Sequence, residues 1–213
     1  MNEIAHWNGQ EKDREKYLLH LSRAPDAMSI TLVRHGKPDF DHSQIVRKNK
    51  TMETLRDYEL SRVSTAPDDN LLNEIKSTKP YGVASELPRS RDSARLLQID
   101  DPKTSALLNE AELPHPTRLM LPMPWKLMLV VCRIGWLLGY KENASGITKD
   151  KQRAREAACF LSEEASVHGN VIAIGHGIMN GLISRELRSM GWSACSNSGR
   201  KYWSATVMTK AVA

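Results

Sequence analysis

Short apolar runs alternate with longer, mixed segments along this chain. The first run, residues 28–33, is short, apolar and β-branched, as a strand buried on both faces of a sheet should be. Similar runs at 81–85 and 171–175 also predict strands. We expect helices over residues 51–61, 67–77, 89–97, 125–140, 148–167 and 180–189, a further strand at 106–108 and a last strand at 202–208.

Strands that alternate with helices predict a three-layer α/β/α fold, with a largely parallel central sheet and helices on both faces. We assign residues 28–213 to this single domain. Residues 11–23 are charge-rich with leucines mixed in, which predicts an amphipathic helix ended by Pro25. We therefore interpret residues 1–27 as an N-terminal helical extension packed on the domain surface. A targeting or partner-binding role is the alternative.

Four prolines exclude a regular helix over residues 114–124. The apolar helix predicted at 125–140 contains Lys126 and Arg133, and it is shorter than the roughly 20 residues of a membrane span. We expect a buried or interfacial helix with no membrane contact. The same helix is a candidate face for a homodimer.

The composition fits one soluble domain of 213 residues, with 40% hydrophobic and 26% charged residues. The formal charge of +5 is spread along the chain, which favours solubility and attraction of anionic substrates. We expect no nucleic-acid partner, because only 6% of residues are aromatic and no basic stripe is interleaved with them. Three widely spaced cysteines without a C-x-x-C pair, and an N-terminus without a secretory pattern, predict a cytoplasmic protein.

The tripeptide Arg34-His35-Gly36 follows the first predicted strand. A histidine at the C-terminal end of a buried strand can attack phosphorus. Arginine offers a planar fork of donors that matches phosphate oxygens, and glycine lets the backbone come close to a ligand. Three residues recur by chance, so this tripeptide alone is also compatible with a strand end that carries a surface histidine.

Three further motifs follow in order. The stretch 85–94, Ser-Glu-Leu-Pro-Arg-Ser-Arg-Asp-Ser-Ala, brings Arg89 to the start of a predicted helix. Asn109-Glu110 then provides an acid, and Gly-His-Gly at 175–177 ends another strand with His176. Ligands of open α/β sheets bind at the carboxyl ends of the strands, so these distant groups can converge there. Two histidines, two arginines and a carboxylate form a complete set for phosphoryl transfer.

Over about residues 28–213 the motifs resemble those of the histidine phosphatase superfamily, also called phosphoglycerate mutase-like. The tripeptide at 34–36 matches the family's R-H-G, and 85–94 is similar to its S-x-L-x-R-(S/A)-x-x-(S/T)-A. The acid at 109–110 stands where the family has its L-x-E, and 175–176 resembles its second histidine motif. The resemblance implies a phosphoglycerate mutase-like fold and a metal-independent phosphatase.

The resemblance also implies a role for each residue. His35 is the nucleophile that becomes a phosphohistidine. Arg34, Arg89 and His176 hold phosphate oxygens and spread the transition-state charge. Glu110 gives a proton to the leaving alcohol and then takes one from water. His35, Glu110 and His176 are thus the expected catalytic residues. We expect no metal and no cofactor, because the arginines supply positive charge and would repel a cation.

Several alternatives remain open. Arg91 competes with Arg89, which the family spacing from Ser85 favours, and Glu112 competes with Glu110. The family often continues R-H-G with threonine or serine and a nearby asparagine, whereas residues 37–41 here read Lys-Pro-Asp-Phe-Asp.

The two acidic residues in that segment would oppose a phosphate unless they point away. The departure also weakens a mutase assignment. The leading interpretation is therefore a phosphatase with a small phosphorylated substrate. A phosphoglycerate-mutase-type phosphotransferase and a non-catalytic binding module are the alternatives. We expect the pocket lid to come from residues 37–60 and 112–140.

Overall fold

The computed structural model describes residues 27–115, 121–142, 144–199 and 201–211. The helix expected over residues 11–23 lies outside these ranges, so the N-terminal extension stays a prediction. Most other elements occur close to where the sequence pattern predicts them.

A central sheet of six strands has the order β4-β3-β6-β1-β8-β7. The pairs β1–β6, β3–β6 and β3–β4 are parallel, whereas β8 runs antiparallel to both β1 and β7. The strands are β1 (Ala27–Arg34), β3 (Tyr81–Ala84), β4 (Lys103–Thr104), β6 (Asn170–Gly175), β7 (Ser193–Asn197) and β8 (Ala205–Ala211). The largely parallel sheet predicted from the sequence is confirmed.

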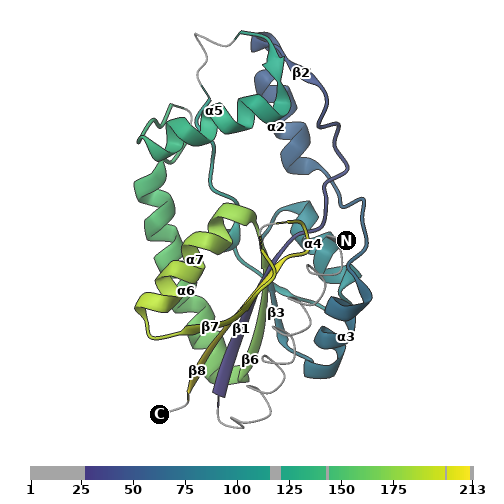
Figure 1. The fold of residues 1–213 in the computed structure, drawn as a ribbon, viewed down its shortest axis with the longest axis vertical. Coiled ribbons are helices and arrows are strands. Elements are labelled where there is room, and N and C mark those ends of the chain that lie inside the picture. Colours follow the sequence, from purple (N-terminus) through teal and green to yellow (C-terminus); the bar gives the residue numbers. More distant parts are fainter. Residues whose placement is uncertain (1–26, 116–120, 143, 200, 212–213) are drawn as a thin grey trace, which may run out of the picture.

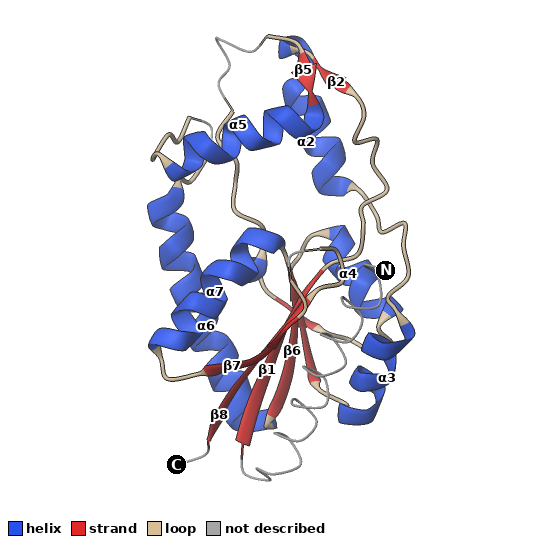
Figure 2. Cartoon of the chain, viewed as in Figure 1, coloured by secondary structure: helices blue, strands red, loops and turns tan. Residues whose placement is uncertain are grey.

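Helices cover both faces of this sheet (Figures 1 and 2). One face carries α3 (Asp69–Thr78) and α4 (Pro88–Leu96), and the other carries α6 (Ile147–His168) and α7 (Gly177–Ser189). Each face has its own apolar core, so the β-branched and apolar residues of β1 and β6 are buried from both sides. This arrangement confirms the three-layer α/β/α prediction.

A cap lies beyond the carboxyl ends of the parallel strands, at the top of Figure 1. It contains a short two-stranded sheet and two helices: β2 (Ile45–Val46), β5 (Met123–Pro124), α2 (Thr51–Leu60) and α5 (Trp125–Leu137), with a 3-10 turn at Lys48–Lys50. Pairing of β2 with β5 joins the two segments expected to form the lid. A separate apolar cluster around Trp125 and Met128 holds the cap together.

One strand prediction was wrong, one strand begins later than predicted, and one strand was missed. Residues Ala106–Leu108 form a 3-10 turn, because the Ser105 side chain accepts a hydrogen bond from the Leu107 N–H at 3.3 Å and starts a turn there. The strand beside β3 is instead β4, which has two exposed residues. The last strand begins at Ala205, not at 202, and β7 was not predicted. Its sequence, Ser-Ala-Cys-Ser-Asn, lacks the apolar alternation that marks a strand.

The outer face of α5 is apolar and exposed. Its large exposed side chains are Leu127, Val130, Val131, Ile134 and Leu137. Among the described residues, none of the helices combines the length and the apolar character that spanning a membrane requires. The homodimer expected at this helix stays a prediction.

We expect Val171→Ala to lower the free energy of unfolding by about 2 kcal/mol, because Val171 in β6 is fully buried and its truncation leaves a cavity. Val167 in α6 is 76% exposed, so Val167→Ala should change stability by at most about 0.5 kcal/mol. Urea unfolding of the two variants measures this difference. Equal losses in both variants would contradict the core described above.

Candidate active site

Three parallel strands end together and bring distant motifs into contact. In the β1–β6 register Arg34 lies opposite Gly175, and the His35 N–H donates to the Gly175 carbonyl at 3.0 Å. On the other side of β6, the Ser85 N–H donates to the Ile174 carbonyl at 3.0 Å. His35, His176 and Ser85 therefore leave the sheet at the same edge.

His35 is held as a neutral ring with an available lone pair. The side chain is only 2% exposed. Its Nδ1 lies 2.7 Å from the Gly36 carbonyl oxygen, which can only accept, so Nδ1 carries the ring proton. Nε2 is then the unprotonated nitrogen, and Arg89 Nε donates to it at 3.3 Å. Nε2 is the ring atom that a nucleophilic role requires.

Arg89 is buried at the start of α4, where it links the core to the cap. Its Nη1 donates to the backbone carbonyls of Tyr58 at 3.3 Å and Glu59 at 3.0 Å, both in α2. Its guanidinium carbon lies 5.0 Å from the centre of the Tyr58 ring. Arg91 is exposed on the same helix. The structure therefore brings Arg89, not Arg91, to His35.

His176 is fully buried beside His35, with the ring centroids 4.9 Å apart. Its Nε2 lies 2.7 Å from Ser85 Oγ and 3.2 Å from Ser90 Oγ. Its Nδ1 has no hydrogen-bond partner among the described residues. That nitrogen is a buried polar atom available to a ligand oxygen.

Burial and nearby cations keep both histidines neutral. The pKa of His35 is lowered from 6.5 to about 3, first by desolvation and then by the charge of Arg89. The pKa of His176 is lowered well below its usual value, again first by desolvation and then by Arg89. Both rings are therefore uncharged at neutral pH.

Arg34 lies where β1, α7 and the loop before β8 meet. Its guanidinium carbon is 4.4 Å from the centre of the Tyr202 ring. A Cβ on Gly177 would lie 3.3 Å from Arg34 Nε, so the absence of a side chain at 177 leaves room for the arginine. The glycine at position 177 therefore allows the Arg34 side chain to pack against the first turn of α7.

Glu110 and Glu112 occupy different environments. Glu110 Oε1 accepts from the Ala111 N–H at 3.0 Å and from the Met179 N–H at 3.2 Å, which places it at the first turn of α7, directly after His176. Glu112 lines the same pocket but is exposed, and its Oε2 accepts from the Ser145 N–H at 2.8 Å. The structure brings Glu110 close to the second histidine and ties Glu112 to a surface loop.

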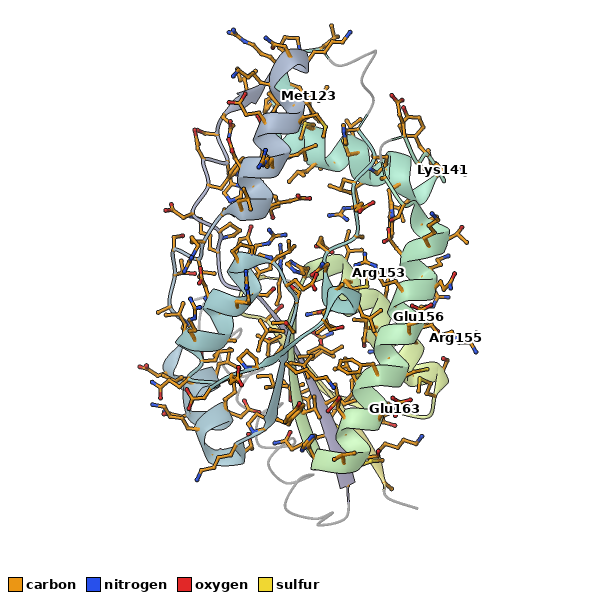
Figure 3. The ribbon with its side chains drawn as sticks, turned by 180° about the vertical axis from the view of Figure 1, so that it is seen from behind. Met123, Lys141, Arg153, Arg155, Glu156 and Glu163 are labelled. Atoms are coloured by element: carbon orange, nitrogen blue, oxygen red, sulfur yellow. The ribbon has the colours of Figure 1, made fainter. Side chains whose placement is uncertain are left out.

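Arg153 in α6, which is labelled in Figure 3, contacts the segment that carries Glu110. It donates to the carbonyls of Ala106, Asn109 and Glu110 at 3.3, 2.7 and 3.2 Å. It also pairs with the buried Asp150 at 2.8 Å. The donors of Arg153 are therefore occupied by the protein itself.

A pocket of about 1110 Å³ lies between the cap and the strand ends. Arg34, Arg89 and Glu110 line it, whereas the two histidines are buried behind the lining. Among the described residues, no group of three or more His, Cys, Asp and Glu side chains has metal-binding geometry. From the cap, the pocket is lined by His42, Leu55, Tyr58, Glu59, Lys126, Leu129 and Arg133.

Gly36 is needed for close packing of the protein itself. The sequence instead predicts that this glycine lets the backbone come close to a ligand. A Cβ at this position would lie 2.4 Å from the Trp203 ring and 2.5 Å from Val63. The Gly36 N–H donates to Ser93 Oγ at 2.9 Å, and Ser93 Oγ donates to the Arg89 carbonyl at 2.7 Å. Ser93 thereby joins the His35 loop to α4.

The acidic residues after Gly36 do not face the pocket. Asp39 and Asp41 are exposed, and neither lines it. The Asp41 carboxylate accepts from the N–H and hydroxyl of Ser43 at 2.8 and 2.6 Å. The departure from the common family pattern therefore adds no negative charge at the strand ends.

Sequence reasoning missed several residues that shape the site. Ser90 and Ser93 were within a recognised motif, so their helical spacing from Arg89 was a usable signal. No local pattern marks the residues that approach from other elements, which are Tyr58, Arg133, Arg153 and Tyr202.

Comparison with known proteins supports the fold. No family model matches the chain, and no curated protein matches it by sequence. Among solved structures, a mycobacterial glucosyl-3-phosphoglycerate phosphatase is similar with a TM-score of 0.57 at 16% identity, over 86% of this chain and 90% of that one. A second mycobacterial protein, hydrolase 2, has a TM-score of 0.56 at 17% identity, over 88% and 84%.

A phosphoserine phosphatase from Entamoeba histolytica, in complex with phosphoserine, is similar with a TM-score of 0.53 at 9% identity. The similarity covers 87% of this chain and 95% of that one. These structures show that the chain has the phosphoglycerate mutase-like fold implied by its motifs.

We expect stability to fall in acid because of the two buried histidines. Both rings are neutral in the folded protein, whereas in the unfolded chain they take up protons below about pH 6.5. Stability is therefore highest above pH 6.5 and is lost as the pH falls toward 3, by up to about 1.4 kcal/mol per pH unit for each histidine. Urea unfolding at pH 7.5 and pH 5.0 measures the loss. The loss should be smaller in His176→Gln, and an undiminished loss there would rule out this histidine as a source.

Proposed function

We propose that this protein is a metal-independent phosphatase that hydrolyses phosphomonoesters through a phosphohistidine intermediate on His35. The observation that carries the proposal is the unprotonated Nε2 of His35, which accepts from Arg89 Nε at 3.3 Å beneath the pocket. Two of the structures with this fold are phosphatases by name. The proposal rests on the site residues themselves.

In the first step, the lone pair of His35 Nε2 attacks phosphorus in line with the ester oxygen. A P–N bond forms, the P–O ester bond breaks, and the leaving oxygen takes a proton from the Glu110 carboxyl group. Phosphate binding would replace the Arg89–His35 hydrogen bond with one from Arg89 to a phosphate oxygen. That exchange frees the lone pair as the phosphoryl group arrives.

In the second step, water attacks the phosphohistidine. Glu110, now a carboxylate, takes the water proton, the P–N bond breaks, and inorganic phosphate leaves with His35 neutral again. The low pKa of His35 favours this step, because the ring departs readily as the uncharged species.

Three groups would stabilise the phosphoryl oxygens. Arg34 and Arg89 supply charged donors, and His176 supplies its unpartnered Nδ1, which carries the ring proton when Nε2 accepts from the two serine hydroxyls. Arg89 and His176 are buried and Arg34 is half-buried at the pocket wall, so charge that develops on the oxygens would meet donors that are already in place.

The two alternatives predict different outcomes. A phosphoglycerate-mutase-type phosphotransferase would isomerise a monophosphoglycerate when primed with a bisphosphoglycerate, whereas a phosphatase would release inorganic phosphate. A non-catalytic binding module would do neither. The phosphatase proposal includes two further points. The protein acts in the cytoplasm, and its substrate is a small phosphorylated molecule.

We expect hydrolysis of p-nitrophenyl phosphate that is insensitive to a chelator and is lowered at least about 10³-fold by His35→Ala, because the nucleophile is removed. Arg91→Ala should retain activity within about twofold, since Arg91 is exposed on α4. Quenching with SDS at alkaline pH after reaction with ³²P-labelled substrate should trap a phosphoenzyme in the parent only, and the label should be lost on later exposure to acid. Equal activity of His35→Ala and the parent would refute the enzyme proposal.

We expect Glu110→Gln to reduce kcat about 10²-fold or more for an alkyl phosphate such as β-glycerol phosphate. The rate of the first step with p-nitrophenyl phosphate should fall much less, because nitrophenolate leaves without a proton. Glu112→Gln is the matched control and should change both rates by less than about threefold. A larger effect of the Glu112 substitution would transfer the acid role to that residue.

A further inference from the structure

The pocket has a second cationic end, on the cap side, that the phosphoryl chemistry does not use. Lys126, Leu129 and Arg133 line the pocket from α5. They follow helical spacing on one face, opposite the exposed apolar face of the same helix. Lys37 and His42 line the pocket from the loop before β2. Lysine, arginine and histidine side chains from two separate segments thus face one space.

Two polar atoms at this end are buried without partners. Arg133 Nη1 and His42 Nε2 have no hydrogen-bond partner among the described residues. An unsatisfied buried donor costs about 1–3 kcal/mol, so such atoms call for an explanation. Arg153, which lines the same pocket, has its donors taken up by three carbonyls and Asp150. Arg133 therefore differs from a structural arginine in having donor capacity left for a ligand.

Basic side chains outnumber acidic ones at this end of the pocket: Lys37, His42, Lys126 and Arg133 line it, together with the acidic Glu59 from α2. Burial lowers the pKa of His42, and the charges of Lys37 and Lys126 lower it further, so both lysines lie close to this ring. Burial likewise lowers the pKa of Arg133, whereas the charge of Glu110 raises it, so this guanidinium has the Glu110 carboxyl group among its neighbours. On the opposite wall, the acidic side chains already have hydrogen-bond donors: Glu112 accepts from Ser145 and Glu156 accepts from Gln152.

The span between the two cationic ends suits a small molecule. The Tyr58 ring contacts both ends, with its centre 5.0 Å from the Arg89 guanidinium carbon and 6.4 Å from the centre of the His42 ring. The sum of these two distances, about 11 Å, is the upper limit of the separation between Arg89 and His42. A substrate with two anionic groups a few bonds apart can therefore reach both.

We propose that Arg133 and His42, with Lys126 and Lys37 adding charge, form a subsite for a second anionic group on the substrate, a carboxylate or a second phosphate. This inference rests on the proposed function, because it assumes that Arg34 and Arg89 hold the phosphoryl group to be transferred. The guanidinium of Arg133 donates to the anion, and His42 donates in the Nε2–H tautomer. A substrate whose remainder is neutral leaves Arg133 Nη1 and His42 Nε2 without hydrogen-bond partners. A substrate with a second anionic group satisfies both atoms and is therefore bound more tightly.

Binding of non-hydrolysable phosphonates tests the subsite without requiring turnover. We expect isothermal titration calorimetry to show that 4-carboxybenzylphosphonate binds at least about tenfold more tightly than 4-carbamoylbenzylphosphonate, since a charge-assisted pair of this kind contributes about 1.4 kcal/mol or more. Para-xylylene bisphosphonate provides the second arm. A larger gain with it than with the carboxylate would identify phosphate as the second group, and the reverse would identify carboxylate.

Variants assign the preference to residues. Arg133→Gln and His42→Gln should each lower the ratio of the two dissociation constants at least about threefold. Because the two residues come from different segments, a folding defect in one leaves the other as a test. Arg155→Gln is the matched control, since Arg155 is exposed on α6, points outward in Figure 3 and does not line the pocket, so the ratio should stay at the parent value.

The outcomes separate this inference from the proposed function. Equal dissociation constants for the carboxylate and the amide in the parent protein, or a ratio unchanged in both variants, would overturn the subsite. Turnover of the corresponding aryl phosphates is measured alongside. Absent turnover with a preserved binding preference would overturn the phosphatase and leave the subsite standing. Turnover of the aryl phosphates without any binding preference for the carboxylate would support the phosphatase and overturn the subsite.

Discussion

The parallel pairing of β1 with β6 is the constraint on which the rest of the site depends. With Arg34 opposite Gly175, both chains leave the sheet at one edge and the rings of His35 and His176 lie 4.9 Å apart. Pairing of β3 on the other side of β6 adds Ser85 at 2.7 Å from His176. Side chains alternate between the faces of a strand, so a slip of one residue would turn a histidine to the opposite face and dismantle the site.

Burial at this edge sets the electrostatics. Removing His35 and His176 from water and placing Arg89 beside them holds both rings neutral. A cationic environment around uncharged rings would suit the attack on an anion that we propose, because the arginines would attract a phosphate without protonating the ring. The hydrogen bond from the His35 ring to the Gly36 carbonyl, and the hydrogen bonds between His176 Nε2 and the Ser85 and Ser90 hydroxyls, satisfy most of the ring nitrogens that burial would otherwise leave unpaired.

The cap depends on the core through one buried arginine. Arg89 donates to two carbonyls at the end of α2 while it contacts His35, so the cap and the nucleophile share a partner. Helix α5 has two different faces. Lys126 and Arg133 face the pocket, and the exposed apolar side chains face outward. The chemistry that we propose for the strand ends and the substrate selection that we propose for the cap would thus come from different layers of the molecule.

The amino-acid sequence alone determined the layered fold, because strands buried on both faces appear as short apolar runs between helices. The order of the four motifs also placed His35 and His176 at strand ends, because each histidine directly follows such a run. The choice of Arg89 over Arg91 was also within reach, through spacing from Ser85. Strand β7 was not within reach, because its pairing with β8 decides it, and the turn at Ala106–Leu108 was missed although the Ser105 side chain that starts it is local. Only tertiary packing placed Tyr202 against Arg34, Arg153 beneath Glu110 and Arg133 in the pocket, because hydrogen-bond partners and desolvation depend on neighbours distant in the chain.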